Sequence, residues 1–326
     1  MTEEKKNIYI SYWLLLITLL VATIIVVGGL TRLTDSGLSI TKWDLFTGVI
    51  PPLSLEKWNL SFSLYKQIPE FKLLNSTMTL SEFKFIFWWE YVHRLLGRVI
   101  GLFFLIPLLY FTFKKMLSKN QILNFYLIFI LICFQGFIGW YMVVSGLSNR
   151  TDVSHYRLSI HLTIAFFIFI LVTLNYLKFK NFKNIEGKKI PFYLPNIFIF
   201  LILFQITMGA FVSGLDAGKI YQTWPMMNGH YFPDDSELKD LLTFKSFETP
   251  SIVQFLHRNI AYFIFLTFLF ILIPVYKNKD FYYLRNNALL ILIALLVQII
   301  LGIFAVISGA QIFIASMHQI GSIFLI

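Results

Sequence analysis

The stretch EYVHRLLGR, residues 90–98, lies inside a long apolar run and carries four ionisable side chains within three helical turns. They are Glu90, His93, Arg94 and Arg98. An ionisable group inside a membrane is energetically expensive, so its presence there indicates a function. The meaning of these four groups therefore depends on whether the run crosses a membrane.

The composition predicts an all-α integral membrane protein. Of 326 residues, 57% are hydrophobic and 13% charged, and the mean hydropathy is +0.72, far from the average of soluble domains. The net charge of +10 is spread over short loops rather than gathered in a basic domain, so it predicts no nucleic-acid partner and instead reports topology. Cys133 is the single cysteine, which excludes an intramolecular disulfide and a thiolate cluster.

Eight apolar segments are candidate transmembrane helices. They are residues 8–31, 86–113, 122–146, 158–177, 191–214, 252–275, 287–309 and 311–326, the last of them short and expected to be a partial span. Positive clusters follow the even-numbered spans: Lys114, Lys115 and Lys119; Lys178, Lys180, Lys183, Lys188 and Lys189; and Lys277, Lys279 and Arg285.

The loop charges predict the orientation of these spans. By the positive-inside rule the N-terminus is cytoplasmic, and the long loops 34–85 and 215–250 lie on the outer side. The first ten residues contain acidic groups and no arginine, unlike a mitochondrial transit peptide. We therefore expect a multi-pass protein of the bacterial inner (plasma) membrane, surrounded by lipid.

The chain also contains an internal repeat. Gln135, Gly139, Ser145 and Gly146 recur 163 residues later, and YVHR at 91–94 recurs as FLHR at 255–258. Five more residues recur at a spacing of 181: Asp35, Gly37, Trp43, Gly48 and Pro52 match Asp216, Gly218, Trp224, Gly229 and Pro233. We expect two pseudo-symmetric four-helix bundles, residues 1–185 and 186–326, inserted in the same direction.

The repeat sorts the histidines. His93 matches His257 and His161 matches His318, and each lies near the start of an even-numbered span. All four are therefore expected at a similar depth, toward the outer side. Two imidazoles on different helices of one bundle are a common way to hold a haem iron from both faces. The sequence thus predicts two haem sites, each with two histidine ligands.

Small residues support this interpretation, because a porphyrin lying against a helix leaves no room for a large side chain one turn from its ligand. The residues at position i+4 after the four histidines are Gly97, Ala165, Ala261 and Ser322. The alternative is that these histidines only form hydrogen bonds between helices. His155 and His230 have no repeat counterpart, and we expect them to be ordinary loop histidines.

Glu90 distinguishes the two halves, because Gln254 occupies the equivalent position in the second. A catalytic bundle would use a desolvated carboxyl group to accept protons near the iron. The alternative is a structural carboxylate at a helix start, favoured there by the macrodipole.

Several arginines near the histidines or the span ends are candidates to neutralise haem propionates. They are Arg94, Arg258, Arg32, Arg98 and Arg157. For any one of these side chains, the alternative is an interfacial arginine that extends toward the headgroups.

Several segments together resemble the haem A synthase family, in its proteobacterial and mitochondrial-like branch. They are GGLTRLTDSGLS (28–39), WWEYVHRLLGR (88–98), FQGFIGWYMVVSGL (134–147), HYRLSIHL (155–162), WPMMNG (224–229) and FLHR (255–258). The resemblance implies an oxidoreductase that converts a ring methyl of haem O to the formyl group of haem A, for cytochrome c oxidase assembly. It also implies haem O synthase and oxidase assembly factors as candidate partners, and a homo-oligomer as a candidate assembly.

Matched residue by residue, the resemblance implies that His93 and His161 ligate the substrate haem and that His257 and His318 ligate a haem b. Glu90 matches the family's important carboxylate. Some relatives carry a cysteine pair in the first outer loop, whereas residues 34–85 contain no cysteine. A thiol-dependent step in that loop is therefore not expected.

Two other function classes remain open from the sequence. A di-haem cytochrome b could transfer electrons from a quinol to an outer acceptor without altering haem. A transporter built from repeats would bind no pigment and gives no reason for paired histidines. Haem content separates the transporter from the others, and conversion of haem O separates the remaining two.

Overall fold

The computed structural model describes residues 2–44, 47–180 and 193–326. It confirms an all-α membrane protein: these residues form seven helices long and apolar enough to cross a membrane, and a shorter apolar helix at Ile312–Leu325. The chain divides into two compact units, Met1–Phe182 and Lys183–Ile326. The boundary expected at residue 185, with Lys183, Lys188 and Lys189, lies outside the described residues.

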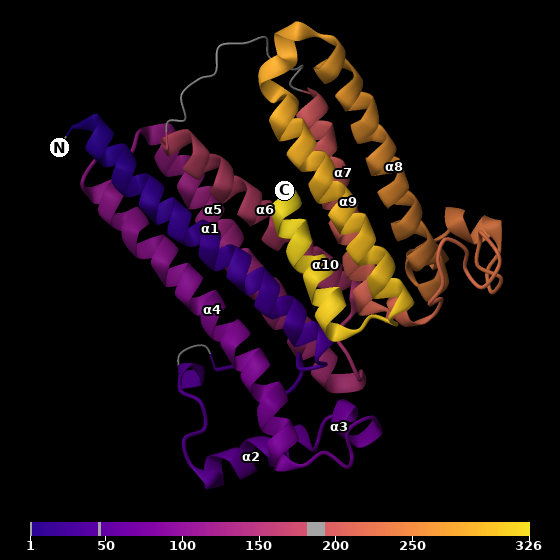
Figure 1. The fold of residues 1–326 in the computed structure, drawn as a ribbon. Helices are drawn as coiled ribbons and strands as arrows, with labels where there is room; N and C mark the ends of the chain where they lie inside the picture. The colour runs from indigo at the N-terminus through magenta and orange to yellow at the C-terminus, as the bar shows by residue number, and fades with distance from the viewer. Residues whose placement is uncertain (1, 45–46, 181–192) are drawn as a thin grey trace. The chain divides into compact units, whose positions relative to one another are not determined.

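Four long helices build the first unit: α1 (Glu3–Leu33), α4 (Leu80–Phe113), α5 (Lys119–Asn149) and α6 (His155–Phe179). Helix α1 packs against α4 and α6, and α5 packs against the same two helices (Figure 1). Polar side chains begin three of these helices, with Thr2 capping α1 and capping boxes at Thr79–Glu82 and Ser118–Gln121. Such caps satisfy backbone N–H groups that have no partner within the helix.

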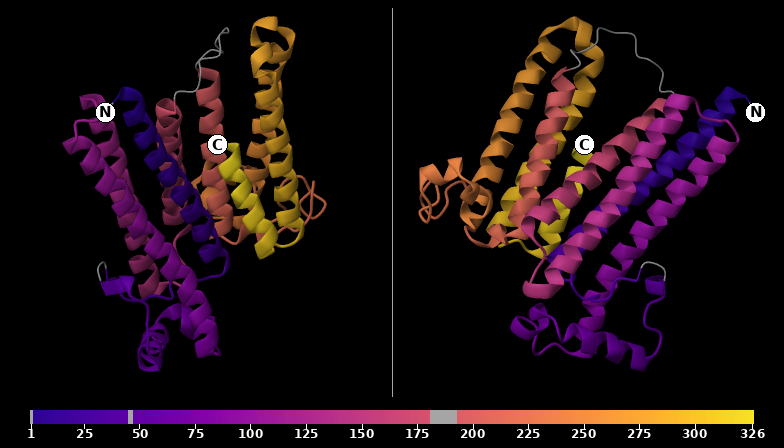
Figure 2. Two further views of the ribbon diagram at one scale, coloured as in Figure 1. Left: turned by 60° about the vertical axis from the view of Figure 1, so that its left-hand side comes forward. Right: turned by 180° about the vertical axis from the view of Figure 1, so that it is seen from behind.

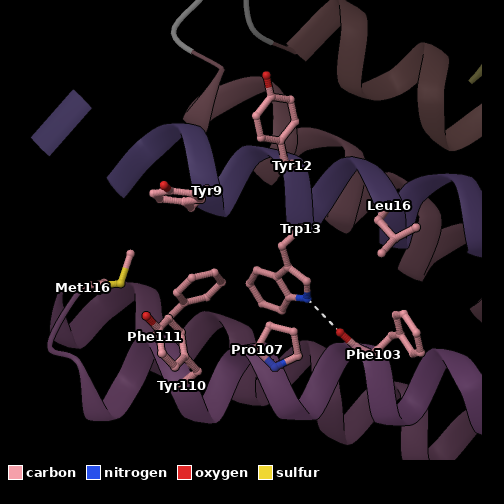
Figure 3. A pocket seen from close by; sticks show the side chains of 9 residues that line it. All are labelled: Tyr9, Tyr12, Trp13, Leu16, Phe103, Pro107, Tyr110, Phe111 and Met116. Atoms are coloured by element: carbon pink, nitrogen blue, oxygen red, sulfur yellow. Dashed lines mark hydrogen bonds between the residues drawn. The ribbon is translucent and has the colours of Figure 1, made fainter. Parts of the chain in front are cut away.

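Helices α1 and α4 are joined by a hydrogen bond at a proline. Pro107 lies inside α4 and has no N–H, so the carbonyl oxygen of Phe103, one turn earlier, lacks its usual donor. The indole Nε1 of Trp13 donates to this oxygen at 2.9 Å. Figure 3 shows the indole directed at the carbonyl of Phe103 beside the proline ring, in a pocket between the two helices.

Part of the long loop predicted at 34–85 is helical. It contains α2 (Leu55–Tyr65), α3 (Pro69–Leu73) and the short turn η1 (Thr47–Val49). Helix α4 begins at Leu80, earlier than the predicted residue 86, and its first turns pack on α2. We call residues 47–79 the cap. Its apolar residues Trp58, Phe62 and Tyr65 share one core with the start of α4.

This early start corrects one interpretation of Glu90. The carboxylate lies eleven residues beyond Thr79, the N-cap of α4. A helix macrodipole acts on charges within the first turn. Glu90 is therefore not a helix-start carboxylate.

The second unit contains α7 (Tyr193–Gly214), α8 (Pro250–Lys277), α9 (Arg285–Ile307) and α10 (Ile312–Leu325). Helix α8 packs against α7 and α9, and α9 packs against α10 (Figures 1 and 2). The connections contain only short turns: η2 (Ala217–Lys219), η3 (Leu238–Leu242), η4 (Phe244–Phe247) and η5 (Lys279–Leu284). Repeat-equivalent aspartates follow α1 and α7 with left-handed backbones, Asp35 at φ 48° and Asp216 at φ 51°.

The cap of the first unit contains a buried carboxyl group. Glu70 is 3% exposed, and Asn75 Nδ2 lies 3.5 Å from its Oε1 and donates to the Tyr65 hydroxyl at 2.8 Å. Within the described residues its Oε2 has no hydrogen-bond partner. Burial raises the pKa of Glu70 from 4.5 to about 8; a hydrogen bond from Tyr65 opposes this rise, and the negative charges of Glu90, Asp35 and Asp152 add to it.

This shift makes the stability of the cap depend on pH. Because the folded pKa of Glu70 is raised, its contribution to stability is complete below about pH 4.5 and is lost as the pH rises through about 8. We expect protection of α3 against hydrogen exchange, corrected for the intrinsic rate, to fall by roughly tenfold or more over that range. Glu70→Gln should remove this fall, whereas substitution of the exposed Glu56 by Gln should preserve it. An unchanged pH dependence in Glu70→Gln would contradict the assignment.

Candidate functional site

The structure brings the four repeat-related histidines together as two pairs, one in each unit. His93 of α4 and His161 of α6 have ring centroids 6.4 Å apart and ring planes at 89°. His257 of α8 and His318 of α10 have centroids 6.4 Å apart and planes at 84°. All four residues are partly exposed rather than buried in the core. The two units thus contain nearly the same arrangement.

This arrangement fits a group ligated from both faces. A histidine–metal bond is about 2 Å long, so two imidazoles that share one metal have ring centroids about 6 Å apart. Within the described residues, Nδ1 of His161, His257 and His318 is buried without a hydrogen-bond partner. Buried nitrogens of this kind normally have partners. The described residues contain no group of three or more His, Cys, Asp or Glu that could hold a metal ion.

A glycine on a neighbouring helix lies against each imidazole. A β-carbon built on Gly28 would lie 3.1 Å from the His93 ring, and one on Gly139 would lie 3.0 Å from His161. The second unit repeats this, with 3.2 Å from Gly209 to His257 and 3.0 Å from Gly302 to His318. Since real β-carbons rarely approach other atoms so closely, each ring takes its position because its neighbour has no side chain.

Glu90 forms an ion pair close to His93. The carboxylate is 2% exposed, and its Oε1 accepts hydrogen bonds from Arg94 Nη2 at 2.6 Å and Nε at 3.1 Å. Its Oε2 accepts from the Ser39 hydroxyl and the Ile40 backbone N–H, both at 2.7 Å. Arg94 also donates to the carbonyl oxygen of Ile40 at 3.0 Å and lies 4.8 Å from the ring centre of Trp43. Glu90 and Arg94 together attach the segment after α1 to α4.

The second unit has the arginine of this arrangement without the carboxylate. Arg258 is 9% exposed, and its Nη2 donates to the carbonyl oxygen of Tyr221 at 3.0 Å. Gln254, equivalent to Glu90, donates to the same oxygen at 3.1 Å. Within the described residues, Nε and Nη1 of Arg258 are buried without hydrogen-bond partners. Two charged donors are therefore available beside His257, whereas the Nε of Arg94 is bonded to Glu90.

The other three arginines make polar or ring contacts within the first unit. Arg32 forms an ion pair with Asp35 at 2.7 Å. Arg98 donates to the carbonyl oxygen of Asp44 at 2.9 Å. Arg157 donates to the Ser145 hydroxyl and lies over the Tyr141 ring, 4.5 Å from its centre. These contacts are compatible with either sequence interpretation, propionate binding or an interfacial role.

The remaining histidines and the cysteine lie apart from the two pairs. His155 begins α6, with its ring 4.4 Å from that of Tyr156. His230 is exposed and its backbone pairs with Met227. Cys133 is exposed on α5.

Sequence reasoning missed two kinds of residue at the site. The facing glycines were detectable, because Gly28 and Gly209 share the 181-residue spacing and Gly139 and Gly302 the 163-residue spacing. Gln205, which donates to the carbonyl oxygen of His257, could not be detected from the repeat, because the equivalent position in the first half is Ile24.

Comparison with known proteins places the chain among similar sequences over nearly its whole length. Residues 11–326 match the family model described as "Cytochrome oxidase assembly protein". A protein of Pelagibacter ubique (strain HTCC1062) named "Heme A synthase" is 51% identical over 323 residues, 97% of this chain and 93% of that protein. Proteins of the same name from Rickettsia bellii (strain OSU 85-389) and Bartonella henselae are 44% and 42% identical, over 99% and 97% of this chain and 96% and 89% of theirs.

The facing glycines give a direct test of the site. Gly139→Ala places a β-carbon 3.0 Å from the His161 ring and should displace it, which lowers haem retention in the first unit by roughly tenfold for a loss of about 1.4 kcal/mol. Gly136→Ala, on the same helix, meets no atom within 4 Å and serves as the control. Haem absorbance per purified protein measures both. Equal haem content in the two variants would contradict the close-packed geometry.

Proposed function

We propose that this chain, which belongs to the family of cytochrome oxidase assembly proteins, is a haem A synthase. The observation that carries the proposal is the pair of facing histidines in each unit, in a chain 42–51% identical to proteins named for this activity. The enzyme acts on haem O within the membrane and yields haem A. In reaction class it is an oxidoreductase, since a ring methyl becomes a formyl group.

The two units are proposed to hold different haems. His93 and His161 bind the substrate haem in the first unit, and His257 and His318 bind a resident haem b in the second. The difference between Glu90 and Gln254 supports this division, because oxidation of a methyl group releases protons as well as electrons. Only the first unit places a carboxylate near its histidines at this position.

The bound iron supplies the redox chemistry, and the protein supplies position and proton handling. The imidazoles of His93 and His161 orient the substrate from both faces. Glu90 lies one helical turn from His93 and is held by Arg94, Ser39 and Ile40. In the proposed reaction Glu90 accepts a proton, and Arg94 holds the carboxyl group in one position. The buried environment excludes bulk water from this exchange.

Arginines are proposed to bind the haem propionates. Arg258 is the best supported, because its Nε and Nη1 lack hydrogen-bond partners within the described residues, and a guanidinium with free donors matches a carboxylate. Arg94, Arg32 and Arg157 already have protein partners. For these three, propionate binding requires sharing or replacing a contact.

The membrane orientation follows from the loop charges. We propose that the chain spans a bacterial inner membrane with its N-terminus in the cytoplasm and the cap on the outer side. His161, His257 and His318 lie about two turns after the starts of α6, α8 and α10. His93 lies further along α4, whose first turns pack on the cap, so all four histidines then lie toward the outer side.

Conversion of haem O tests the function. The chain, expressed with a haem O synthase in bacteria that lack their own haem A synthase, should produce haem A, detected by mass in pigment extracts. His93→Ala should abolish haem A and leave haem O. Haem b and haem O bound without any haem A would instead support a di-haem cytochrome that only transfers electrons.

Replacement of Glu90 tests its role in the proposed reaction. Glu90→Gln keeps an amide oxygen for Ser39 and Ile40 but removes the charge that Arg94 pairs with. We expect near-normal haem binding and a fall in haem A formation of roughly 100-fold, the usual size of a lost acid–base group, with haem O or a partly oxidised haem accumulating. Ser39→Ala, which removes one hydrogen bond and keeps the charge, should remain active. Normal haem A formation by Glu90→Gln would remove this residue from the mechanism.

A further inference from the structure

A glutamine amide from a neighbouring helix is bonded to the backbone of three of the four site histidines. The pairs are Gln135 to the carbonyl oxygen of His161 at 2.9 Å, Gln205 to His257 at 2.9 Å and Gln298 to His318 at 2.7 Å. Each carbonyl already belongs to a helix, so the amide adds a second donor. These bonds connect two helices at the level of the histidine.

His93 is the exception. Within the part of the chain that the structure describes, no side chain donates a hydrogen bond to its carbonyl oxygen. The position on α1 equivalent to Gln205 is Ile24. Ile24 lies against Gly97, with 3.8 Å between its Cδ1 and a β-carbon built on that glycine. An apolar contact thus replaces the amide bond one turn after His93.

Helix α1 forms a hydrogen bond with α4 one turn before His93, and this bond is longer than that of Gln205 to His257. The hydroxyl of Thr31 lies 3.3 Å from the carbonyl oxygen of Trp89 and 2.8 Å from that of Val27 on its own helix. The shorter contact is the internal one, so the bond between the helices is the weaker of the two. In the second unit, by contrast, the Gln205 amide donates to the carbonyl oxygen of His257 at 2.9 Å.

The arginines beside the histidines also differ between the two units, in how many of their donors are already bonded. Arg94 has its Nε and Nη2 occupied by the carboxylate of Glu90. Arg258 has two buried donors without partners in the described residues. An anionic group bound between the histidines therefore meets a neutralised arginine in the first unit and an available one in the second.

We propose that Ile24 and Gln205 are positioning residues that set how firmly each histidine pair holds its haem. Gln205 anchors His257, so the second unit retains its haem. Ile24 leaves the backbone of His93 without this anchor, so the first unit releases its haem readily, as a site that binds a substrate and gives up a product must do. The difference in haem retention between the two units is inferred from the hydrogen bonds alone. The interpretation of faster release as release of a product rests on the proposed function.

The physical basis is the effect of outer contacts on a ligand. Hydrogen bonds that hold a metal ligand's orientation commonly change affinity 10- to 100-fold when removed. A single neutral hydrogen bond to a helix carbonyl contributes less, about 2- to 10-fold in an equilibrium or a release rate. The glycine packing and ring spacing are alike in the two units, so they do not produce the difference.

Haem transfer to excess apomyoglobin measures release from each site. The full chain is placed in lipid nanodiscs, with His318→Ala leaving only the first site intact and His93→Ala leaving only the second. We expect faster transfer from the first site. Gln205→Met, which keeps the length and removes the amide, should speed release from the second site by about 2- to 10-fold. Equal rates from the two sites, or no effect of Gln205→Met, would overturn the proposal.

The reciprocal substitution provides a matched pair. Ile24→Gln should install a donor toward His93 and slow release from the first site by about 2- to 10-fold. Ile24→Met, of similar length and without a donor, should change the rate by less than twofold. If Met slows release as much as Gln, packing rather than hydrogen bonding sets retention, and the proposal is wrong.

Hydrogen exchange gives a readout that does not depend on haem. In haem-free protein, amides of residues 255–261 should be better protected than those of 91–97, and Gln205→Met should remove the difference while α9 keeps its protection. Loss of protection in α9 as well would show misfolding, and Ile24→Gln against Ile24→Met then decides the question. A protein with different release rates that makes no haem A would overturn the proposed function and support this inference.

Discussion

In each helical unit two imidazole rings have centroids 6.4 Å apart, and this spacing is the constraint on which the structure depends. Close packing leaves little freedom in where such side chains lie. Here a glycine on the neighbouring helix lies against each of the four rings and determines how close the ring can lie to that helix. The helices must approach closely at these four points. The proline contact and the glutamine bonds join neighbouring helices and so help to fix the positions of the helices that carry the histidines.

The charges near the histidines differ between the two repeated units. Arg94 and Arg258 donate to equivalent carbonyl oxygens, those of Ile40 and Tyr221. In the first unit Glu90 neutralises the arginine, and in the second Gln254 leaves it charged and partly without partners. In the proposed function, this single difference between acid and amide assigns proton transfer to the first unit and anion binding to the second.

Much of the membrane fold could be predicted from the sequence, because a span needs only a long apolar segment and a helix satisfies its own backbone. The pairing of His93 with His161 could be inferred from the repeat, because each half of the chain contains two of the four repeated histidines. The helices of the cap could not, because α2 and the first turns of α4 form around a shared aromatic core. Nor could the partners of Glu90, since Ser39 and Ile40 are about fifty residues distant, and no local pattern reports a contact of that range.

The indole of Trp13 has a consequence far from its own position. Helices α1 and α4 run in opposite directions, with Trp13 beside Pro107 at one level (Figure 3) and Gly28 beside His93 at another. Fifteen residues separate Trp13 from Gly28 along α1, about 22 Å at 1.5 Å per residue. A slip of one residue would spoil a fit whose clearance is tenths of an ångström. The proline leaves one carbonyl oxygen free to accept a hydrogen bond from Trp13. That bond fixes the axial register of α1 against α4, and with it the position of Gly28 against the His93 imidazole.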